Sequence, residues 1–161
     1  MGVTVTRKIN ANLDKALKEL DKLTGKVGWF KSSIYRNGEA VAYIATIQEY
    51  GVPEKGIPAR PFMRPTIAAN QEVWKKILLM KSAEILEGTR TAKEAMESVL
   101  IRAKADIQKT ISELQDPPLA ASTIAARLRK KTDQKTLGLL SKPLVDTGHM
   151  RDTVSYEIEK L

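Results

Sequence analysis

The chain has 161 residues, no cysteine, one histidine and a formal net charge of +8. The lack of cysteine excludes disulfides and thiolate metal sites, and the single His149 excludes a site that needs two histidines. No window has the apolar length of a signal peptide or a membrane span, so we expect one soluble domain over residues 1–161 with no membrane contact. The positive charge draws in polyanions or acidic proteins.

The first part of the chain predicts short strands around one helix. Residues 3–5 alternate in polarity, which indicates a strand, and the leucines of 12–24 recur every three or four residues, which predicts a helix that Gly25 ends. Residues 26–35 have the composition of a strand, and the turn-forming sequence at 36–38 follows them.

Residues 39–50 fit either a strand or a helix, because their apolar positions match both periods. The alanines in this segment and Gly51 after it favour the helix.

Residues 58–65, with the sequence PARPFMRP, form a proline-rich strap. Three prolines fix φ and remove three backbone donors, so we expect a stiff, extended connector rather than a helix interior or a central strand. Phe62 is predicted to anchor the strap in the core. Arg60 and Arg64 are predicted to contact neighbouring subunits or backbone carbonyls.

Two long amphipathic helices are predicted after the strap, over 67–86 and 92–114. Thr89 or Thr91 supplies the N-cap of the second, with Glu94 as the capping-box partner of Thr91. The short turn between the helices predicts an antiparallel hairpin roughly 30 Å long.

The prolines at 117–118 end the second helix. A shorter helix with a basic end is predicted over 119–131, a flexible loop over 132–142, and a half-buried strand over 154–158. The expected fold is α+β: a small, mostly antiparallel sheet, which includes the strand with Trp29, packed against the long antiparallel helical hairpin.

The triplet Asp146-Thr147-Gly148 also occurs in aspartic proteases. Such a protease needs two of these aspartates, from two lobes or two subunits, and a further half-domain after the triplet. Only thirteen residues follow Gly148, so we favour Asp146 or Thr147 as the cap of a helical turn. His149 is expected to be a polar surface or interface residue. No phosphate loop or cluster of metal ligands is apparent, and we expect no catalytic, cofactor or metal site.

The segment 127–135 carries five positive charges, one negative charge and no aromatic residue. Contact with nucleic-acid phosphates needs only charge, whereas base stacking needs aromatic side chains. An acidic protein surface and plain solvent exposure remain alternatives. The candidates for facing DNA are Arg127, Arg129, Lys130, Lys131 and Lys135.

Several motifs follow one another in a recognisable order: VGWF at 27–30, VAYIA at 41–45, QEYG at 48–51, IPARPFMRP at 57–65, PPL at 117–119, TIA at 123–125, KPLVDTG at 142–148 and VSY at 154–156. In this order the chain resembles tailed-bacteriophage neck and tail-completion proteins, the group that includes the minor tail protein Z of lambda and Mu-type virion morphogenesis proteins. The likeness spans most of residues 26–160.

The resemblance implies a structural virion protein without catalysis, which completes the tail or joins it to the head-neck as a ring subunit around the DNA channel. The implied partners are further copies of itself, six in the ring, other tail and neck proteins, and packaged DNA through nonspecific contacts. The implied location is the virion, after assembly in the host cytoplasm. The alternative is a nonspecific nucleic-acid-binding protein that uses 127–135. We assign the following residues to interfaces: Glu49, Tyr50, Arg60, Phe62, Arg64 and Asp146.

Overall fold

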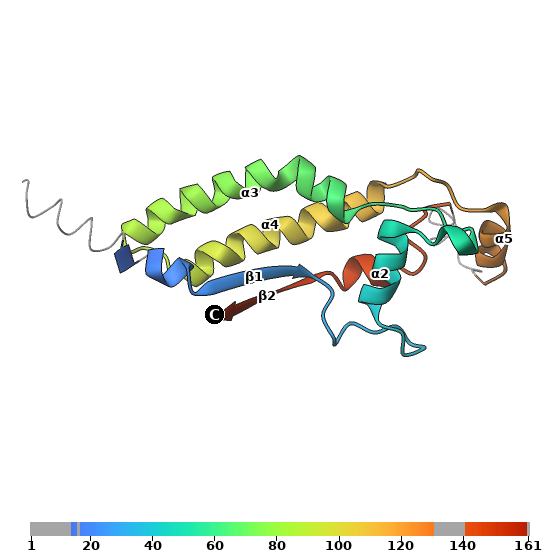
Figure 1. Cartoon of the computed structure of the whole chain (residues 1–161), viewed down its shortest axis with the longest axis horizontal. Helices are drawn as coiled ribbons and strands as arrows, with labels where there is room; N and C mark the ends of the chain where they lie inside the picture. The colour runs from blue at the N-terminus through green and yellow to red at the C-terminus, as the bar shows by residue number, and fades with distance from the viewer. Residues whose placement is uncertain (1–13, 16, 131–140, 161) are drawn as a thin grey trace, which may run out of the picture. The chain divides into compact units, whose positions relative to one another are not determined.

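The computed structural model describes residues 14, 15, 17–130 and 141–160. Its elements are β1 (Leu23–Gly28), α2 (Val41–Tyr50), the 3-10 helix η1 (Pro53–Lys55), α3 (Met63–Leu86), α4 (Ala92–Glu113), α5 (Ala121–Lys130), α7 (His149–Asp152) and β2 (Ser155–Lys160) (Figure 1). The described residues form two compact units, one drawn from 1–27, 70–104 and 156–161, the other from 28–69 and 105–155. Within the described part, no helix is long and apolar enough to cross a membrane.

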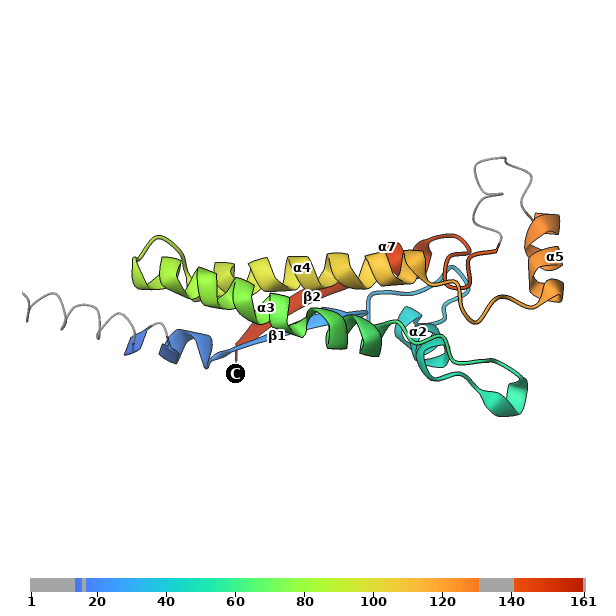
Figure 2. The same cartoon turned by 90° about the horizontal axis from the view of Figure 1, so that it is seen from above.

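The predicted α+β class is confirmed. β1 and β2 form a two-stranded antiparallel sheet that packs against the pair of α3 and α4. The two helices lie side by side in Figure 1 and in Figure 2, as expected for the hairpin. An ion pair between Lys26 and Glu159 joins the two strands. The strand predicted at 3–5 lies outside the described residues.

The turn between α3 and α4 is closed by backbone hydrogen bonds. Gly88 has a φ of 75°, its N–H donates to the carbonyl of Ile85, and the N–H of Thr89 donates to the carbonyl of Glu84. This is the pairing of a Schellman motif, which requires a left-handed residue at this position and so favours glycine. The hydroxyl of Thr89 also donates to the Glu84 carbonyl, so Thr89 belongs to the end of α3.

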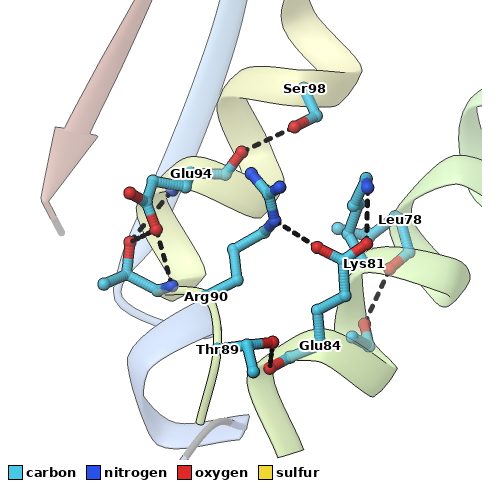
Figure 3. Close-up of polar contacts among 9 residues, drawn as sticks. Leu78, Lys81, Glu84, Thr89, Arg90, Glu94 and Ser98 are labelled. Carbon is cyan, nitrogen blue, oxygen red and sulfur yellow. Dashed lines mark hydrogen bonds and ion pairs between the residues drawn. The ribbon is translucent and has the colours of Figure 1, made fainter. Parts of the chain in front are cut away.

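The predicted capping box at the start of α4 is confirmed. The Thr91 hydroxyl accepts the N–H of Glu94 at 3.3 Å, and Glu94 Oε2 accepts the N–H of Thr91 at 2.8 Å (Figure 3). Across the same turn, Glu84 accepts hydrogen bonds from Lys81 and Arg90, as Figure 3 shows. The capping box satisfies two N–H groups that the start of a helix leaves unpaired, and the ion pair of Glu84 with Arg90 joins the end of α3 to the turn.

The prediction that Gly25 ends a helix is wrong, because Gly25 lies inside β1. A Cβ at this position would lie 3.0 Å from side-chain atoms of Leu100 and Met96, both on α4. Glycine therefore allows the strand to pass close to the helix, a role that local sequence does not reveal.

The strand predicted over 26–35 is displaced toward the N-terminus, since β1 ends at Gly28. Beyond it, Ile34 forms an isolated antiparallel bridge with Ala40, around the predicted turn with Gly38 at a φ of 85°. β1 ends just before Trp29, whose side chain contacts Phe62 and Met150, as described below.

The strap is shorter than predicted, because α3 begins at Met63 and includes Pro65 in its first turn. A proline is tolerated there, since the first N–H groups of a helix have no acceptor within the helix and the fixed φ suits it. The extended connector is therefore limited to residues 58–62.

The remaining elements agree with the sequence patterns. The predicted segment 39–50 contains the helix α2 (Val41–Tyr50), which ends at Gly51 with a φ of 72°. Helix α5 lies within the predicted 119–131, and β2 overlaps the strand predicted over 154–158 and extends to Lys160. The loop predicted over 132–142 falls mostly outside the described residues.

Each unit has its own apolar core. In the first unit, Ile85, Ala92 and Ala95 are buried at the hairpin turn, with Leu20, Leu23 and Leu86 packed against them. In the second unit, the largest fully buried side chains are Phe62, Ile107, Ile111, Val41, Val145, Val154 and Thr66. The second unit contains the motifs at 41–51, 57–65 and 142–148.

Candidate functional site

One carboxylate joins the end of α2 to the start of α3. Glu49 is only 5% exposed. Its Oε2 accepts the N–H groups of Phe62 at 2.7 Å and Met63 at 2.8 Å, and its Oε1 accepts the N–H of Arg64 at 3.1 Å. These donors lie where a helix leaves its N–H groups unpaired. Glu49 is thus the N-terminal cap of α3, supplied by another helix.

Competing effects act on the ionisation of Glu49. Burial raises the pKa of its carboxyl group, but the N–H groups of Met63 and Phe62 and the hydrogen bonds from Arg64 together hold this pKa below its ordinary value. The carboxylate also lies at the positive end of the α3 dipole. Glu49 is therefore ionised at neutral pH, and its charge stabilises the junction.

The guanidinium of Arg64 completes this junction. Its Nε donates to Glu49 Oε1 at 2.9 Å and its Nη2 to the Glu49 carbonyl at 3.1 Å, and the group lies 4.9 Å from the centre of the Tyr50 ring. Tyr50 is 62% exposed, and the Arg64 side chain is 58% exposed. An arginine stacked on a tyrosine at the surface presents a planar, charged face to an incoming partner.

Arg60 is almost fully buried, with 6% of its surface exposed. Its Nε donates to the carbonyl of Pro117 and its Nη2 to the carbonyl of Pro118, both at 2.9 Å, while its backbone N–H donates to the carbonyl of Gln48 at 2.7 Å. Of the two roles predicted for Arg60, the structure places it on backbone carbonyls of its own chain. The strap is thereby joined to the segment after α4.

Phe62 anchors the strap, as predicted, and is 1% exposed. Its ring meets Trp29 edge to face, with ring centres 5.6 Å apart, a favourable geometry for two aromatic rings. The indole N–H of Trp29 donates to the carbonyl of Met150 at 2.8 Å. Trp29 thus connects the strap to the C-terminal motif, a role that its place in a strand pattern did not indicate.

Gly51 permits the close return of the chain after α2. A Cβ on Gly51 would lie 2.6 Å from the backbone nitrogen of Ala59 and 2.8 Å from the carbonyl oxygen of Ile57. These atoms belong to backbone and have little freedom to move. The positive φ and this contact both require glycine.

The segment containing the Asp-Thr-Gly triplet is held by Arg127. The Arg127 Nη1 donates to the carbonyls of Lys142 at 2.8 Å and Val145 at 3.3 Å, and its Nε lies 3.4 Å from Asp146 Oδ1. The Arg127 side chain is 12% exposed and that of Asp146 is 53% exposed. The DNA-facing role predicted for Arg127 does not fit this placement, because its guanidinium is directed at its own chain.

The predicted helical turn is α7 (His149–Asp152), but its N-cap residue is Gly148 and not the predicted Asp146 or Thr147. Gly148 precedes it with a φ of 81°, and the Thr147 hydroxyl accepts the N–H of His149 at 3.3 Å. His149 Nε2 lies 2.9 Å from the Ile34 carbonyl, which makes this nitrogen the protonated one, and its ring packs 4.9 Å from that of Tyr35. Burial, with Glu39 and Asp146 nearby, raises the pKa of Tyr35.

A surface cavity of about 840 Å³ adjoins this turn, with Tyr35, Glu39 and His149 among its lining. Its walls carry both signs of charge, since Arg36 and Asp152 also line it. Within the described part of the chain, no group of three or more histidine or acidic side chains is placed to hold a metal ion.

The predicted site residues therefore separate into two sets. Glu49, Arg60 and Phe62 are buried and contact their own chain, whereas Tyr50, Arg64 and Asp146 are exposed. Of the other residues predicted to face DNA, Arg129 is exposed on α5. The side chains of Lys130, Lys131 and Lys135 lie outside the described residues.

Comparisons with protein-family models, with curated proteins and with solved structures found no match.

Proposed function

We propose that this chain is a structural subunit of a tailed-phage virion, which completes the tail or joins it to the head-neck as a member of a ring around the DNA channel. Its partners are further copies of itself, six in a ring as the resemblance implies, and neighbouring tail and neck proteins. It acts by binding its neighbours through the shape of its surface, and it catalyses no reaction.

One observation carries the proposal: the motifs on which the resemblance rests contact one another. Glu49 of the QEYG motif caps the helix that follows the strap, Phe62 of the strap packs on Trp29, and Trp29 donates to Met150 beside the C-terminal motif. Separate matches that arose by chance have no reason to converge in this way. Their contacts support reading them as parts of one packed module rather than as separate matches.

The mechanical character of this module also suits a ring subunit. The guanidinium groups of Arg60 and Arg64 hydrogen-bond the strap to other parts of the chain, and so do the backbone N–H groups of Arg60 and Phe62. The strap therefore holds a fixed shape. A rigid surface loses little conformational entropy when a neighbour binds, which favours assembly through small interfaces. Tyr50 and Arg64 lie on the exposed side of this rigid part and are the residues that we assign to the contact between copies.

The test is genetic, in a bacterial strain that carries the gene on an inducible prophage. Disrupting the reading frame should yield separate heads and tails by electron microscopy, and supplying the wild-type gene in trans should restore joined particles. Mass spectrometry of purified particles should then detect the chain. Complete, infectious particles that lack the chain would contradict the proposal.

A matched pair of variants locates the contact. Tyr50 and Tyr43 lie on α2, with 62% and 60% of their surfaces exposed. Complementation with Tyr50→Ala should lower the yield of joined particles by about tenfold, as expected for an aromatic residue at the centre of an interface. Tyr43→Ala should complement like wild type, and equal behaviour of the two variants would remove Tyr50 from the interface.

A further inference from the structure

The part of α3 that belongs to the first unit carries large apolar residues on two sides. Ile85 is buried in the core at the hairpin turn, whereas Val73, Leu79 and Met80 are 39%, 74% and 61% exposed. These fractions show that the described residues leave the second side uncovered. A helix that is apolar on both sides is normally buried on both, and a contiguous apolar surface marks an interaction site.

The exposed residues on this side of α3 form one continuous stripe. Five of them lie at helical intervals: Val73, Lys76, Leu79, Met80 and Ala83. Four follow one another at steps of three, four and three residues, and Leu79 adjoins Met80. Residues at such steps are neighbours on a helix surface, and this pattern is the one by which one helix packs along another. We call these five residues the α3 stripe.

Helix α4 carries a matching stripe in the same unit, which consists of Glu94, Ser98 and Ile101 and which we call the α4 stripe. Its members follow one another at steps of four and three residues. Ile101 is 52% exposed, and the hydroxyl of Ser98 donates to the carbonyl of Glu94 in its own helix at 2.8 Å. The small Ser98 therefore leaves a recess beside the projecting Ile101, into which a larger side chain of another helix can fit.

The two stripes also carry complementary charges. Lys76 is exposed and forms no hydrogen bond or ion pair with the described residues. Glu94 contacts the backbone and hydroxyl of Thr91 through Oε2, while its Oε1 accepts no hydrogen bond from the described residues (Figure 3). Each copy of the chain has a net charge of +8. A contact between copies therefore needs opposite charges that face each other locally, and Lys76 and Glu94 supply them.

We propose that the α3 stripe of one copy packs against the α4 stripe of the next copy. The inference rests on the proposed function and deepens it, because it names a pair of faces through which copies in the ring contact one another. A ring requires a head-to-tail contact, in which two different surfaces of the same chain are complementary. The two stripes are such a pair in side-chain size and in charge. This contact adds to the one assigned to Tyr50 and Arg64, which belong to the other unit.

The direct test is cysteine cross-linking of the full chain, which has no cysteine of its own. Met80→Cys and Ile101→Cys each place one thiol at an exposed position of one stripe. An equal mixture of the two variants, treated with a short bismaleimide, should give at least about fivefold more cross-linked dimer than either variant alone, because a head-to-tail contact brings two thiols together only in a mixed pair.

Gln71→Cys is the control for Met80→Cys, since Gln71 is exposed on α3 but lies outside the stripe. Mixed with Ile101→Cys, it should give no more product than the single variants. Equal yields with Gln71→Cys and Met80→Cys would overturn the proposal. Cross-linking of Met80→Cys alone as strong as that of the mixture would show a symmetric contact between two α3 stripes and would overturn it too.

Sedimentation velocity over a range of concentrations tests the same contact without a cross-linker. The wild-type chain should associate beyond the dimer as its concentration rises. Met80→Asp places a charge in the apolar contact and should weaken this association by about tenfold or more. Gln71→Asp changes the net charge equally and should leave the association within about twofold. Equal effects of the two variants would show a diffuse charge effect and contradict the assignment.

The alternatives have outcomes of their own. A wild-type chain that stays monomeric at every concentration would assign the α3 stripe to a different protein, and association that stops at the dimer would indicate a two-fold contact; either result overturns the proposal. Because these assays use the free protein, they can fail while the tail-joining test succeeds, and the reverse also holds.

Discussion

The carboxylate of Glu49 is the group whose removal should most clearly weaken the junction of α2 and α3. Glu49→Gln preserves the size of the side chain but removes its charge and replaces one acceptor oxygen with an NH2 donor. In the wild type, each carboxylate oxygen accepts two hydrogen bonds: Oε2 from the N–H groups of Phe62 and Met63, Oε1 from the N–H and Nε of Arg64. In the variant, the single carbonyl oxygen can accept one of these two pairs of hydrogen bonds. The donors of the other pair face the NH2 group, which cannot accept them.

The magnitude follows from these lost contacts. A hydrogen bond to a charged group contributes about 1.5–3 kcal/mol, and removal of a helix N-cap costs about 0.5–2 kcal/mol. Since two donors lose their acceptor and the other two lose a charged one, we expect Glu49→Gln to lower the free energy of unfolding by about 3 kcal/mol. A domain is commonly stable by about 5–15 kcal/mol, so this loss is large.

Urea unfolding of both proteins, followed by circular dichroism from about pH 7 to pH 3, is the assay. Despite burial, hydrogen bonds from Met63, Phe62 and Arg64 hold the folded-state pKa of Glu49 below its ordinary value, so its contribution is complete above the unfolded pKa and is lost as the pH falls through the folded pKa. The difference between wild type and Glu49→Gln should therefore be greatest near neutral pH and shrink in acid.

Glu54→Gln provides the control, since Glu54 is an exposed glutamate in the same unit, and its effect should stay within about 0.5 kcal/mol. A loss below about 1 kcal/mol in Glu49→Gln at neutral pH, or a difference that does not depend on pH, would refute the capping argument.

Three further changes test other parts of the fold by the same unfolding assay. Phe62→Ala should cost about 3–5 kcal/mol because it empties a buried aromatic site, and a cost near zero would deny its role as an anchor. Gly51→Ala should cost more than about 2 kcal/mol, since the positive φ and the 2.6 Å approach to Ala59 both oppose a Cβ, whereas Gly38→Ala, which meets no atom within 4 Å, should cost less. Thr91→Ala should cost about 1 kcal/mol by breaking the capping box of α4, and an unchanged stability would show that Glu94 alone caps the helix.

Sequence reasoning succeeded where the cause of a structure is local. The end of α3 and the start of α4 follow from apolar periodicity and from residues within a few positions, as the capping box of Thr91 and Glu94 shows. The choice of a helix for residues 39–50 depended on alanine content and on Gly51, and the structure confirms it. The burial of Phe62 followed from an apolar residue in a rigid segment.

Sequence reasoning failed where a residue is chosen for a distant partner. Gly25 resembles a helix stop, but its place is determined by Leu100 and Met96 on α4. Arg127 belongs to a basic run, but it bonds to carbonyls some fifteen residues later. The sequence immediately around Gly25 or Arg127 does not contain these partners, so the local pattern predicts a different role for each residue.

The amino-acid sequence by itself determined the two long helices, the turn between them and the helix before Gly51, because hydrogen bonding within a helix and a cap supplied by the next few residues depend on neighbours in the chain. The tertiary structure alone decided the roles of charged residues whose partners are distant in the sequence: Glu49 caps another helix, and Arg60 is buried against the carbonyls of Pro117 and Pro118. The physical reason is that the free energy of a charge depends on its burial and on the groups around it in space, and these are fixed only when distant segments pack together.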